Sequence, residues 1–592
     1  MIKSIQEDRK TFVYRFLEAS IGLTSIGFLA SLVLFSIFDA TRSYVSIFLI
    51  LYGLLWVLKL TLNTSYTVYS YKQLRRWESF DWDKFWTNTK RNWKSAVNQL
   101  ESFKETYSKS GNWQLGMEKD LRGMKDIVGT KYADFAGIYQ VNIFSIYNES
   151  AEVLLKSLKC IYDSKYDLDK LLVIVSQEAR NGQHKNSLVR DRVAEQKWLH
   201  SEYISETDLK LVYSTKHYSQ PKQKSKLDSY TKSEFADYKL APKKLNIIFT
   251  EHPDGLVGEV KGKASNEDWG GRQASLFIKS KKIDPELVLV TSLDADSHIS
   301  PYFYHNLSYR FCLSSDRLNI GYQPIHVYSN NFFQTGVWPR QVAAQTTLHN
   351  MSQLAIDNET SFFAIYSAPL VVLQQVNFWV REVIAEDSTL FIKCLAYFKG
   401  NFRAVPFYGE FAGDAVESDD YLDAVVIQYK QLLRWAWGGV EGFPYMIKKF
   451  FLEENTSKID LRVRLKWSFL LFTNHVFWSS TPLIFSVGVL LPRLLGGDVF
   501  GATPVSQNLA IFSQYFSWLS FIFLAIFSYI TFVYVGQKAE QTTGAKWYNW
   551  LALLAQCMFS PLIFFLMGFP ALEAQLRGIF GRYLTYLVTP KK

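Results

Sequence analysis

The sequence predicts an α/β domain that is built on a parallel sheet and inserted between membrane-spanning helices. Hydrophobic residues make up 48% of the chain and charged residues 20%, so apolar and polar segments must be segregated along it. Long uncharged runs lie toward both ends, and between them short β-prone runs alternate with helical patterns. At 592 residues the chain is also too long for one compact domain.

Five apolar runs reach the length of about 20 residues that a helix needs to cross a bilayer. They cover residues 18–38, 44–66, 467–491, 510–535 and 549–570. Residues 39–43 form a turn that joins the first two runs into a hairpin. The first run is not a signal peptide, because it lacks a small-residue cleavage site and a second run follows at once. A buried core helix is the alternative interpretation of each run, which their length and lack of charge disfavour.

Basic side chains gather before the first run and after the second, whereas the turn between them holds only Arg42. By the positive-inside rule, residues 67–466 therefore face the cytoplasm. The C-terminal tail is basic as well, although five crossings would place it outside. Because Pro561 and Pro570 interrupt the last run, we expect it to be a re-entrant or interfacial element instead.

We expect four parts along the chain. Residues 1–67 are the transmembrane hairpin, and residues 68–138 are a cytoplasmic interfacial or linker region whose many Trp and Lys residues suit a helix on a membrane surface or a solvated linker helix. Residues 139–450 are the α/β domain, with a polar insertion over about 183–240. Residues 451–592 are a C-terminal membrane region.

Charge and cysteine content limit the partners. A net charge of +10 suits anionic lipid headgroups and phosphate-bearing ligands. The chain has no nucleic-acid-binding motif, so we expect no nucleic acid partner. Four cysteines are scattered without the spacing of a metal site and are interpreted as reduced and structural. They are Cys160, Cys312, Cys394 and Cys557.

Polar side chains follow two predicted strands, residues 141–147 and 171–175. Asn148 and Glu149 come after the first strand, and Glu178 comes after the second. Ligands of parallel α/β sheets bind at the carboxyl ends of the strands. These residues are therefore candidates for a binding site.

The strongest local pattern is the strand 287–293, which is apolar enough to be buried on both faces and leads directly into Asp294-Ala295-Asp296. Two carboxylates one residue apart can hold Mg²⁺ or Mn²⁺, which prefer oxygen ligands and share them with phosphates. A solvated turn is the alternative, and the buried strand before the pair favours the metal site.

Five short motifs follow one another in the order of a known family. They are Ile146-Tyr147-Asn148-Glu149, Lys263-Ala264-Ser265-Asn266, Asp294-Ala295-Asp296, Ala385-Glu386-Asp387 and Gln431-Leu432-Leu433-Arg434-Trp435. Over residues 140–450 the chain resembles the inverting glycosyltransferases of family 2, above all the membrane-integrated branch with the cellulose, chitin and hyaluronan synthases. The resemblance implies a GT-A (Rossmann-like) catalytic domain that uses a nucleotide-sugar donor, with a UDP-sugar foremost, and a glycan or lipid acceptor.

The resemblance also implies roles for single residues. Asp296 would bind the metal directly, with Asp294 on the metal or the nucleotide. Asp387, beside Glu386, would be the general base for the acceptor hydroxyl, and Trp435 would stack on the acceptor sugar. The donor would contact Tyr147, Asn148, Glu149, Glu178, Lys263, Asp294, Gln431 and Arg434.

Two of these motifs also have simpler interpretations. Glu386 and Asp387 suit the N-terminus of a helix predicted over residues 388–398, where the helix dipole favours carboxylates. Arg434 and Trp435 suit an amphipathic helix at the membrane interface. Both interpretations are compatible with the catalytic ones.

The chain departs from the family pattern at two places. Glu178 stands where the family carries an aspartate segment that contacts the base. Residues 361–365 lack the glycine of a Phe-Gly-Thr-like acceptor segment, which weakens the case for processive elongation.

Three functions follow for a multi-pass protein that we expect in a bacterial inner membrane. The first is polysaccharide synthesis. The second is non-processive glycosylation of a lipid, either a polyprenyl phosphate or a glycerolipid. The third, a transporter or scaffold with an inactive transferase domain, is disfavoured because Asp294, Asp296, Asp387 and Arg434 are all present.

Overall fold

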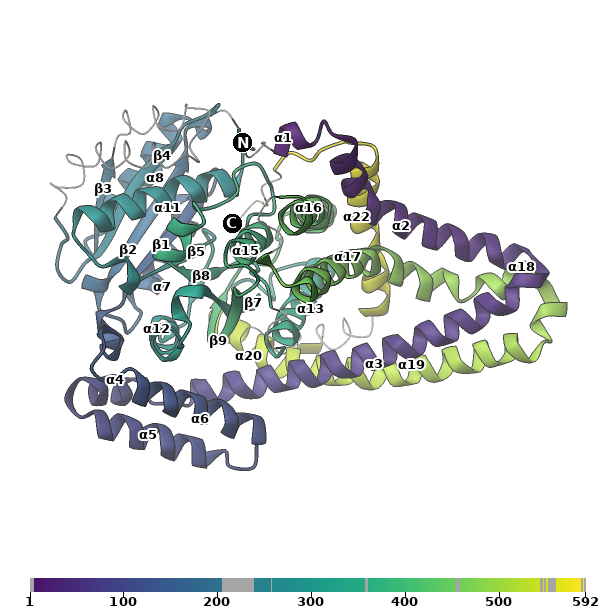
Figure 1. The fold of residues 1–592 in the computed structure, drawn as a ribbon, viewed down its shortest axis with the longest axis horizontal. Helices are drawn as coiled ribbons and strands as arrows, with labels where there is room; N and C mark the ends of the chain where they lie inside the picture. Colours follow the sequence, from purple (N-terminus) through teal and green to yellow (C-terminus); the bar gives the residue numbers. More distant parts are fainter. Residues whose placement is uncertain are drawn as a thin grey trace.

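The computed structural model describes residues 5–204, 239–256, 258–356, 360–453, 458–543, 547, 550–551, 560–586 and 589. An α/β domain lies on one side, and long helices extend from it on the other (Figure 1). Residues 205–238 of the polar insertion expected over 183–240, and residues 549 and 552–559 of the apolar run 549–570, lie outside the described residues.

A nine-stranded mixed sheet organises the α/β domain. Its order is β3-β4-β2-β1-β5-β8-β7-β9-β6. The strands β1 to β5 pair in parallel, and β8 runs antiparallel to β5. Their bounds are Tyr139–Ile146 (β1), Leu171–Glu178 (β2), Leu199–Ile204 (β3), Leu245–His252 (β4), Val288–Leu293 (β5), His298–Ile299 (β6), Ile320–Val327 (β7), Tyr366–Pro369 (β8) and Arg403–Ala412 (β9).

Helices cover both faces of this sheet, so its central strands are buried on both sides and mostly apolar. Every residue of β2 and β5 is buried. The three strands predicted from apolar runs correspond to β1, β2 and β5. The helices of the domain are Ala151–Tyr162 (α7), Gln183–Ala194 (α8), Lys263–Ser280 (α11), Phe303–Leu313 (α12), Val337–Leu354 (α13), Leu370–Gln375 (α14), Glu386–Tyr397 (α15) and Tyr421–Ile447 (α16).

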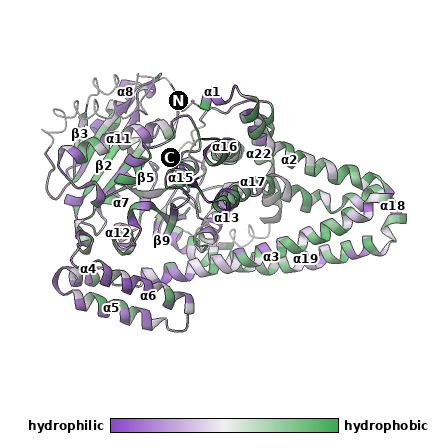
Figure 2. Cartoon of the chain, viewed as in Figure 1, coloured by the Kyte–Doolittle hydropathy of each residue, from purple (hydrophilic) through white to green (hydrophobic). Residues whose placement is uncertain are grey.

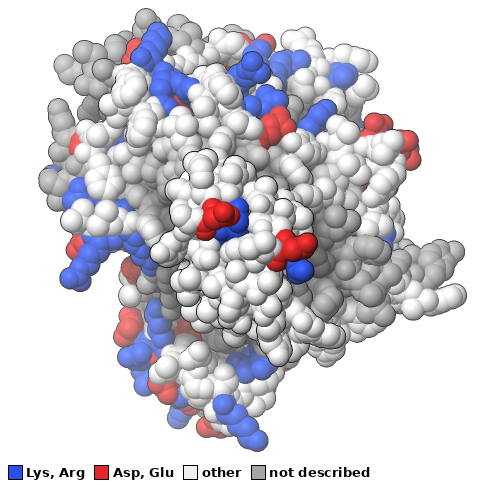
Figure 3. All heavy atoms as spheres, turned by 90° about the vertical axis from the view of Figure 1, so that its right-hand side faces the viewer, with Lys and Arg blue, Asp and Glu red and all other residues white. Residues whose placement is uncertain are grey.

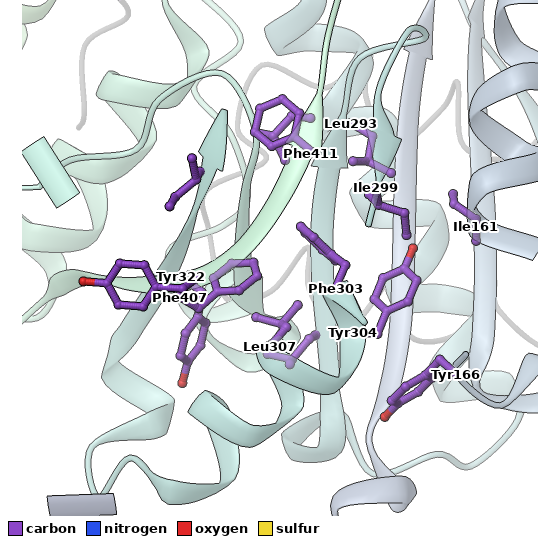
Figure 4. Packing of buried hydrophobic residues seen from close by; sticks show 14 of the residues in the cluster. Ile161, Tyr166, Leu293, Ile299, Phe303, Tyr304, Leu307, Tyr322, Phe407 and Phe411 are labelled. Carbon is purple, nitrogen blue, oxygen red and sulfur yellow. The ribbon is translucent and has the colours of Figure 1, made fainter. Parts of the chain in front are cut away.

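One part of the core lies between α12 and the sheet (Figure 4). Phe303 of α12 meets Phe407 of β9 with ring centroids 5.1 Å apart, and Tyr304 donates to Asn142 Oδ1 of β1 at 2.7 Å. These contacts fasten β9 and β1 through one helix. They fix the sheet edge from which the site residues emerge.

Four helices are long and apolar enough to cross a membrane among the residues that the structure describes. They are Phe12–Ile37, Asp39–Glu78, Leu461–Gly501 and Ile522–Gln541. Figure 2 shows apolar residues concentrated along these extended helices. The third comprises Leu461–Leu483 (α17), a π-helical stretch over Ile484–Gly488, and Leu491–Gly501 (α18); the fourth overlaps Pro504–Ile530 (α19), a second π-helical stretch over Thr531–Gly536, and Gln537–Thr543 (α20).

The first two of these apolar helices, α2 (Phe12–Ile37) and α3 (Asp39–Glu78), reverse at Phe38, so the turn predicted over 39–43 is the first turn of α3 instead. Arg42 explains the difference, because its Nε donates to Ser36 O at 2.8 Å and its Nη2 to Ile37 O at 2.7 Å. The guanidinium thereby caps the end of α2. Figure 3 views this end of the helices and shows a few acidic and basic side chains side by side on an uncharged surface.

Three short helices follow α3. They are Trp82–Arg91 (α4), Trp93–Thr106 (α5) and Gly111–Asp126 (α6). Trp77, Trp82 and Trp113 are buried among them, and Tyr309 of α12 donates to Asp120 at 2.8 Å. These tryptophans therefore pack the interior of a helical subdomain. The sequence pattern of residues 68–138 had instead suggested a helix on a membrane surface or a solvated linker helix.

The C-terminal tail leaves α22 (Ser560–Ile579) and runs beside the N-terminal segment that begins with α1 (Ile5–Asp8). Tyr583 donates to Glu18 Oε2 at 2.9 Å, and Arg15 Nη1 lies 2.9 Å from the Tyr583 hydroxyl. Segments near both ends of the chain thus meet at the N-terminal end of α2.

Candidate active site

Lys263 lies at the centre of the candidate site. Its Nζ lies 2.8 Å from Asp294 Oδ1, 3.2 Å from Glu386 Oε1 and 3.6 Å from Glu267 Oε1. Asp294 follows β5, Glu386 begins α15, and Glu267 lies one turn along α11 from the lysine. One ammonium group therefore joins three carboxyl groups from separate segments, which we call the Lys263 cluster.

Burial and charge oppose each other in the Lys263 cluster. Burial alone would lower the pKa of Lys263, but the three facing carboxylates raise it well above its ordinary value. Burial raises the pKa of Glu267 and of Glu386, and the lysine offsets only part of that rise. Glu267 also accepts from Ser292, and the Tyr366 hydroxyl lies 3.3 Å from its Oε2. The lysine thus stays charged at neutral pH.

Asp296 belongs to a neighbouring set of contacts. It is buried, and its Oδ2 accepts the backbone N–H of Asp414 at 2.9 Å. Asn330 Nδ2 donates to the Asp296 carbonyl at 3.1 Å and to Asp414 Oδ1 at 2.9 Å. The segment after β9 therefore brings a third aspartate beside the predicted metal pair.

These residues fit a hard cation that shares its coordination with a ligand. In the part of the chain that the structure describes, no three His, Cys, Asp or Glu side chains lie close enough together to hold a metal by themselves. Asp294 and Asp296 supply only oxygen donors, and Mg²⁺ or Mn²⁺ is commonly held by one or two carboxylates together with substrate phosphates. The donor set is consistent with that arrangement.

Asp387 is the second residue of α15, where its charge favours the helix dipole. Its Oδ2 accepts the N–H of Ala364 at 3.0 Å, and its Oδ1 accepts the N–H of Ser388 at 2.6 Å. Lys263 Nζ lies 3.5 Å from the Ala364 carbonyl oxygen. The backbone of Ala364 thus links the predicted base to the Lys263 cluster.

Ala364 itself has a left-handed backbone, with φ of 54°. A non-glycine residue in that conformation costs about 1–2 kcal/mol. Ala364 lies within the segment where the family pattern predicts a glycine. The chain therefore lacks the glycine yet has a backbone conformation that glycine adopts easily.

Glu441 of α16 positions the segment that leads into α15. Its Oε2 accepts the N–H of Ile384 at 2.8 Å and of Ala385 at 3.4 Å. Its Oε1 lies 3.2 Å from Arg9 Nη2 of the N-terminal segment. One carboxylate therefore fixes the approach to Glu386 and Asp387.

A second group lies at the carboxyl ends of β1 and β2. The guanidinium of Arg180 lies 4.1 Å from the ring centroid of Tyr147, and Arg180 Nη2 donates to Glu178 Oε1 at 3.0 Å. Glu149 Oε2 accepts the backbone N–H groups of Tyr147 at 2.7 Å and Asn148 at 3.1 Å. Glu149 thus stabilises the turn after β1, and Glu178 orients Arg180.

Arg434 of α16 is directed toward the Lys263 cluster. Burial lowers its pKa, but Tyr586, Glu386 and Asp294 raise the value above that of a free arginine. Its guanidinium lies 5.0 Å from the Tyr586 ring centroid. The Nε of Arg434 is buried without a hydrogen-bond partner among the described residues, so a ligand could use this donor.

Tyr586 of the C-terminal tail also packs against Gly262, the residue before α11. A Cβ added at Gly262 would lie 2.8 Å from Tyr586 Cδ2. The tail therefore closes one side of the Lys263 cluster. No motif in the sequence indicated this contact, because Gly262 and Tyr586 are more than 300 residues apart in the chain.

Two residues of the last motif have other surroundings. Gln431 is buried and accepts from Gln428 Nε2 at 2.9 Å. Trp435 packs against a small hydrophobic cluster that contains Trp338 of α13 and Leu432 of α16. The structure thus places Arg434 by the Lys263 cluster and Trp435 against α13.

Comparison with known proteins relates part of the chain to a family. Residues 289–535, less than half of the chain, match the model described as glycosyl transferase family group 2. The chain therefore contains a glycosyltransferase domain similar to that family. The match begins in β5 and includes Asp294, Asp387 and Arg434. With the mixed sheet, it confirms the predicted fold class, a GT-A domain joined to apolar helices. No curated protein matches the sequence of the transferase.

Several solved structures are weakly similar to the transferase. The mannosyltransferase PcManGT from Pyrobaculum calidifontis, in complex with GDP-Man and Mn²⁺, has a TM-score of 0.36 and 15% identity, over 72% of this chain and 87% of that chain. GalNAc-T7 with UDP, GalNAc and Mn²⁺ has a TM-score of 0.29 and 11% identity, over 57% of this chain and 58% of that chain. TarS of S. aureus, residues 1–349 with UDP-GlcNAc, has a TM-score of 0.24 and 11% identity, over 64% of this chain and 91% of that chain.

The structure brings together residues that the sequence predicted and residues that it did not. Lys263, Asp294 and Glu386 meet in one cluster. Arg434 interacts with it electrostatically, and Asp296 and Asp387 lie beside it. The residues that sequence reasoning missed are Arg180, Glu267, Asp414, Glu441 and Tyr586. Glu267 alone had a usable signal, since it lies four residues after Lys263 and thus on the same face of the helix.

Proposed function

We propose that this transferase moves a sugar from a nucleotide-sugar donor to a glycan acceptor at the cytoplasmic face of a membrane, with inversion at the anomeric carbon, in polysaccharide synthesis. One observation carries the proposal. Lys263 joins Asp294 of the predicted metal motif to Glu386 of the predicted base motif, at 2.8 Å and 3.2 Å. Motifs 92 residues apart (386 − 294) thus share one charged centre.

The donor diphosphate would lie between Lys263 and Arg434. Lys263 supplies an ammonium group that stays protonated at neutral pH. Arg434 supplies a buried Nε donor that lacks a partner among the described residues, and arginine can bind two phosphate oxygens at once. We place the nucleotide base near Tyr147 and Arg180, whose stacked pair offers an aromatic face and a cation.

Asp296 and Asp294 are the residues that would hold Mg²⁺ or Mn²⁺. When bound, such an ion neutralises the charge that develops on the leaving diphosphate. Asp294 already faces Lys263, whereas Asp296 accepts the N–H of Asp414. We therefore assign Asp296 as the direct ligand, with Asp294 shared between the lysine and the donor.

Asp387 would take the proton of the acceptor hydroxyl as its oxygen attacks the anomeric carbon and the diphosphate leaves. Such a base must be held within hydrogen-bond reach of the hydroxyl. The N–H groups of Ala364 and Ser388 hold both carboxylate oxygens of Asp387. A single displacement of this kind inverts the configuration of the sugar.

We further propose that the protein crosses the membrane four times, in a bacterial inner membrane, with the catalytic domain in the cytoplasm. Four candidate spans return the chain to the side on which it begins. The contact of Tyr583 with Glu18 and Arg15 supports a tail on that side, with α22 as a re-entrant or interfacial element. Labelling of a cysteine placed at Arg582 in intact cells tests this topology, and labelling from outside would contradict it.

Non-processive glycosylation of a lipid is the second candidate, because Ala364 replaces the expected glycine beside Asp387. Membranes that contain the protein are incubated with a panel of labelled nucleotide sugars and Mn²⁺ or Mg²⁺, and the label is separated by size and by organic extraction. We expect product of high molecular weight. Product that extracts into organic solvent would support the second candidate, and no transfer from any donor would contradict both.

A further inference from the structure

A cavity of about 630 Å³ lies away from the candidate active site, between the end of α3 and the turn that joins α5 to α6. Figure 1 shows this turn at the end of the α4–α6 subdomain that faces the long membrane helices. The cavity is lined by Ser65, Val68, Tyr69, Lys72, Arg76, Thr106, Tyr107, Ser108, Lys109 and Ser110. Its walls thus combine basic and hydroxyl side chains and contain no acidic one.

Three of the lining residues are basic, namely Lys72, Arg76 and Lys109. None of them forms a salt bridge within 4.0 Å among the described residues, whereas the adjacent Arg75 pairs with Glu78 at 2.7 Å. The cavity therefore concentrates positive charge that no acidic side chain among the described residues pairs with. Such a site favours an anion.

Arg76 is held in place for this role. Its guanidinium lies 4.9 Å from the Tyr107 ring centroid and 5.0 Å from that of Trp113. Its Nη1 donates to Ser110 Oγ at 3.4 Å. Contacts between a cation and aromatic rings fix the side chain and leave its other N–H groups available, so less entropy is lost when a ligand binds.

The position of the cavity along α3 points to the lipid headgroup region. Exposed apolar side chains continue along α3 from Tyr44 to Leu62. Ser65 begins the cavity three residues later, and at a rise of 1.5 Å per residue it lies about 5 Å beyond Leu62. The headgroup layer is about 5–8 Å thick on each side of the hydrocarbon core. Lys72 lies about 10 Å beyond Ser65, within reach of that layer for a long side chain.

We propose that this cavity binds the phosphate headgroup of an anionic membrane glycerophospholipid. Lys72, Arg76 and Lys109 surround the phosphate, and the hydroxyl groups of the α5–α6 turn bind the rest of the headgroup. The bound lipid would anchor the α4–α6 subdomain to the membrane surface. The inference rests on the membrane embedding proposed above and is independent of the transfer reaction.

The test uses the full-length protein, purified in mild detergent, and native mass spectrometry with phosphatidylglycerol, phosphatidylcholine or glycerol 3-phosphate. The variant replaces Lys72, Arg76 and Lys109 by Gln. Its matched control replaces Lys119, Arg122 and Lys125 by Gln, which removes the same charge from exposed positions of α6 outside the cavity.

We expect the wild type and the control to bind phosphatidylglycerol at least about tenfold more tightly than phosphatidylcholine, and the cavity variant to lose this preference. An unchanged preference in the cavity variant would overturn the proposal. Equal binding of glycerol 3-phosphate and phosphatidylglycerol would replace the lipid with a soluble phosphate and would overturn it as well.

A carbonate wash of membranes separates this proposal from the proposed membrane embedding. We expect the wild type and the cavity variant to remain in the membrane after the wash, because four spans hold them there. Release of the wild type would contradict the embedding itself. Thermal unfolding of the purified protein checks that the variant is folded, and a transition close to that of the wild type assigns a lost lipid preference to the cavity.

Discussion

The Lys263 cluster places a lysine that is charged at neutral pH among three carboxyl groups from different elements. Asp294 follows a strand, Glu386 lies at the start of a helix, and Glu267 lies one turn after the lysine in α11. Burial raises the pKa of the two glutamates, so their charge state is the part of the site most sensitive to pH. The aspartates carry the assigned chemistry.

Replacing Glu267 by Gln should change how stability depends on pH. The pKa of Glu267 is raised in the folded state, so this group contributes stability below its ordinary value of 4.5, and the contribution is lost as pH rises toward the raised value. From pH 5 to pH 8 the wild type should therefore lose stability relative to Glu267→Gln, by at most about 1.4 kcal/mol per pH unit. Thermal unfolding at each pH measures this, and parallel curves for both proteins would refute it.

Replacing Asp296 by Ala should remove metal-dependent donor binding. The carboxylate is assigned as the direct ligand, and a cation between Asp296 and the diphosphate couples the affinity for metal to the affinity for nucleotide. In titration calorimetry, Mn²⁺ should increase the affinity of the wild type for the nucleoside diphosphate and should leave the affinity of the variant unchanged. Asp316→Ala, which changes an aspartate paired with Arg403 at 3.0 Å away from this site, is the control that keeps the gain. A full gain in Asp296→Ala would exclude its assigned role.

Replacing Ala364 by Gly should stabilise the protein. The left-handed φ of 54° costs alanine about 1–2 kcal/mol, and the greater freedom of glycine in the unfolded state cancels about 0.4–1 kcal/mol of the gain. We expect a net gain of about 0.5–1 kcal/mol in denaturant unfolding. Ala368→Gly in β8 is the control, and it should destabilise because glycine is unfavourable within a strand. A loss of stability in both variants would contradict the strained backbone at Ala364.

At the scale of elements, helix α16 contributes to the site twice. Arg434 reaches the Lys263 cluster, and Glu441, two turns later, fixes the segment before α15. Removing Glu441 with Ala leaves the N–H groups of Ile384 and Ala385 without their acceptor and should lower kcat about tenfold with KM nearly unchanged. Steady-state kinetics measures both constants.

Glu441→Gln is the matched variant, because its amide oxygen can still accept from Ile384. We expect it to restore most of kcat. Arg9 keeps Glu18 as a partner at 2.9 Å in both variants, so the N-terminal contact remains. Equal loss of kcat in both variants would show that charge, not positioning, is what Glu441 provides.

Sequence reasoning predicted the elements whose signals are local. The apolar runs predicted β1, β2 and β5, because strands buried on both faces are mostly apolar. The capping positions gave α15, since Glu386 and Asp387 suit a helix N-terminus. The hairpin turn was placed too late in the chain, because the capping by Arg42 reaches back across Phe38 and leaves no local signature.

The site residues that sequence reasoning missed act across long separations. Asp414 reaches Asp296 from the segment after β9, and Tyr586 reaches Arg434 from beyond the last helix. A motif of neighbouring residues cannot encode such contacts, which exist only after the sheet has formed and α22 has packed. Glu178 pairs with Arg180, a residue that sequence reasoning did not single out, and the contact of Glu178 with the donor stays a prediction.

At the scale of the whole molecule, segments near both ends of the chain contact α16 of the α/β domain. Arg9 contacts Glu441 of α16, and the ring centroid of Tyr586 lies 5.0 Å from the Arg434 guanidinium. Tyr583 also contacts Glu18 of the apolar helix α2. The two terminal segments therefore help to frame the candidate site.

The most direct test of the account is turnover by Asp387→Asn. The variant and the wild type are purified in parallel. Sugar transfer is measured with the donor that the panel of nucleotide sugars identifies, and binding is measured with the nucleoside diphosphate of that donor. Removal of a general base lowers the rate by about 10²–10⁴-fold, and Lys263, Arg434 and Asp296 remain to bind the donor. We predict that transfer falls by at least about 10²-fold while nucleoside diphosphate affinity stays within about threefold of the wild type. Transfer at the wild-type rate would contradict the account.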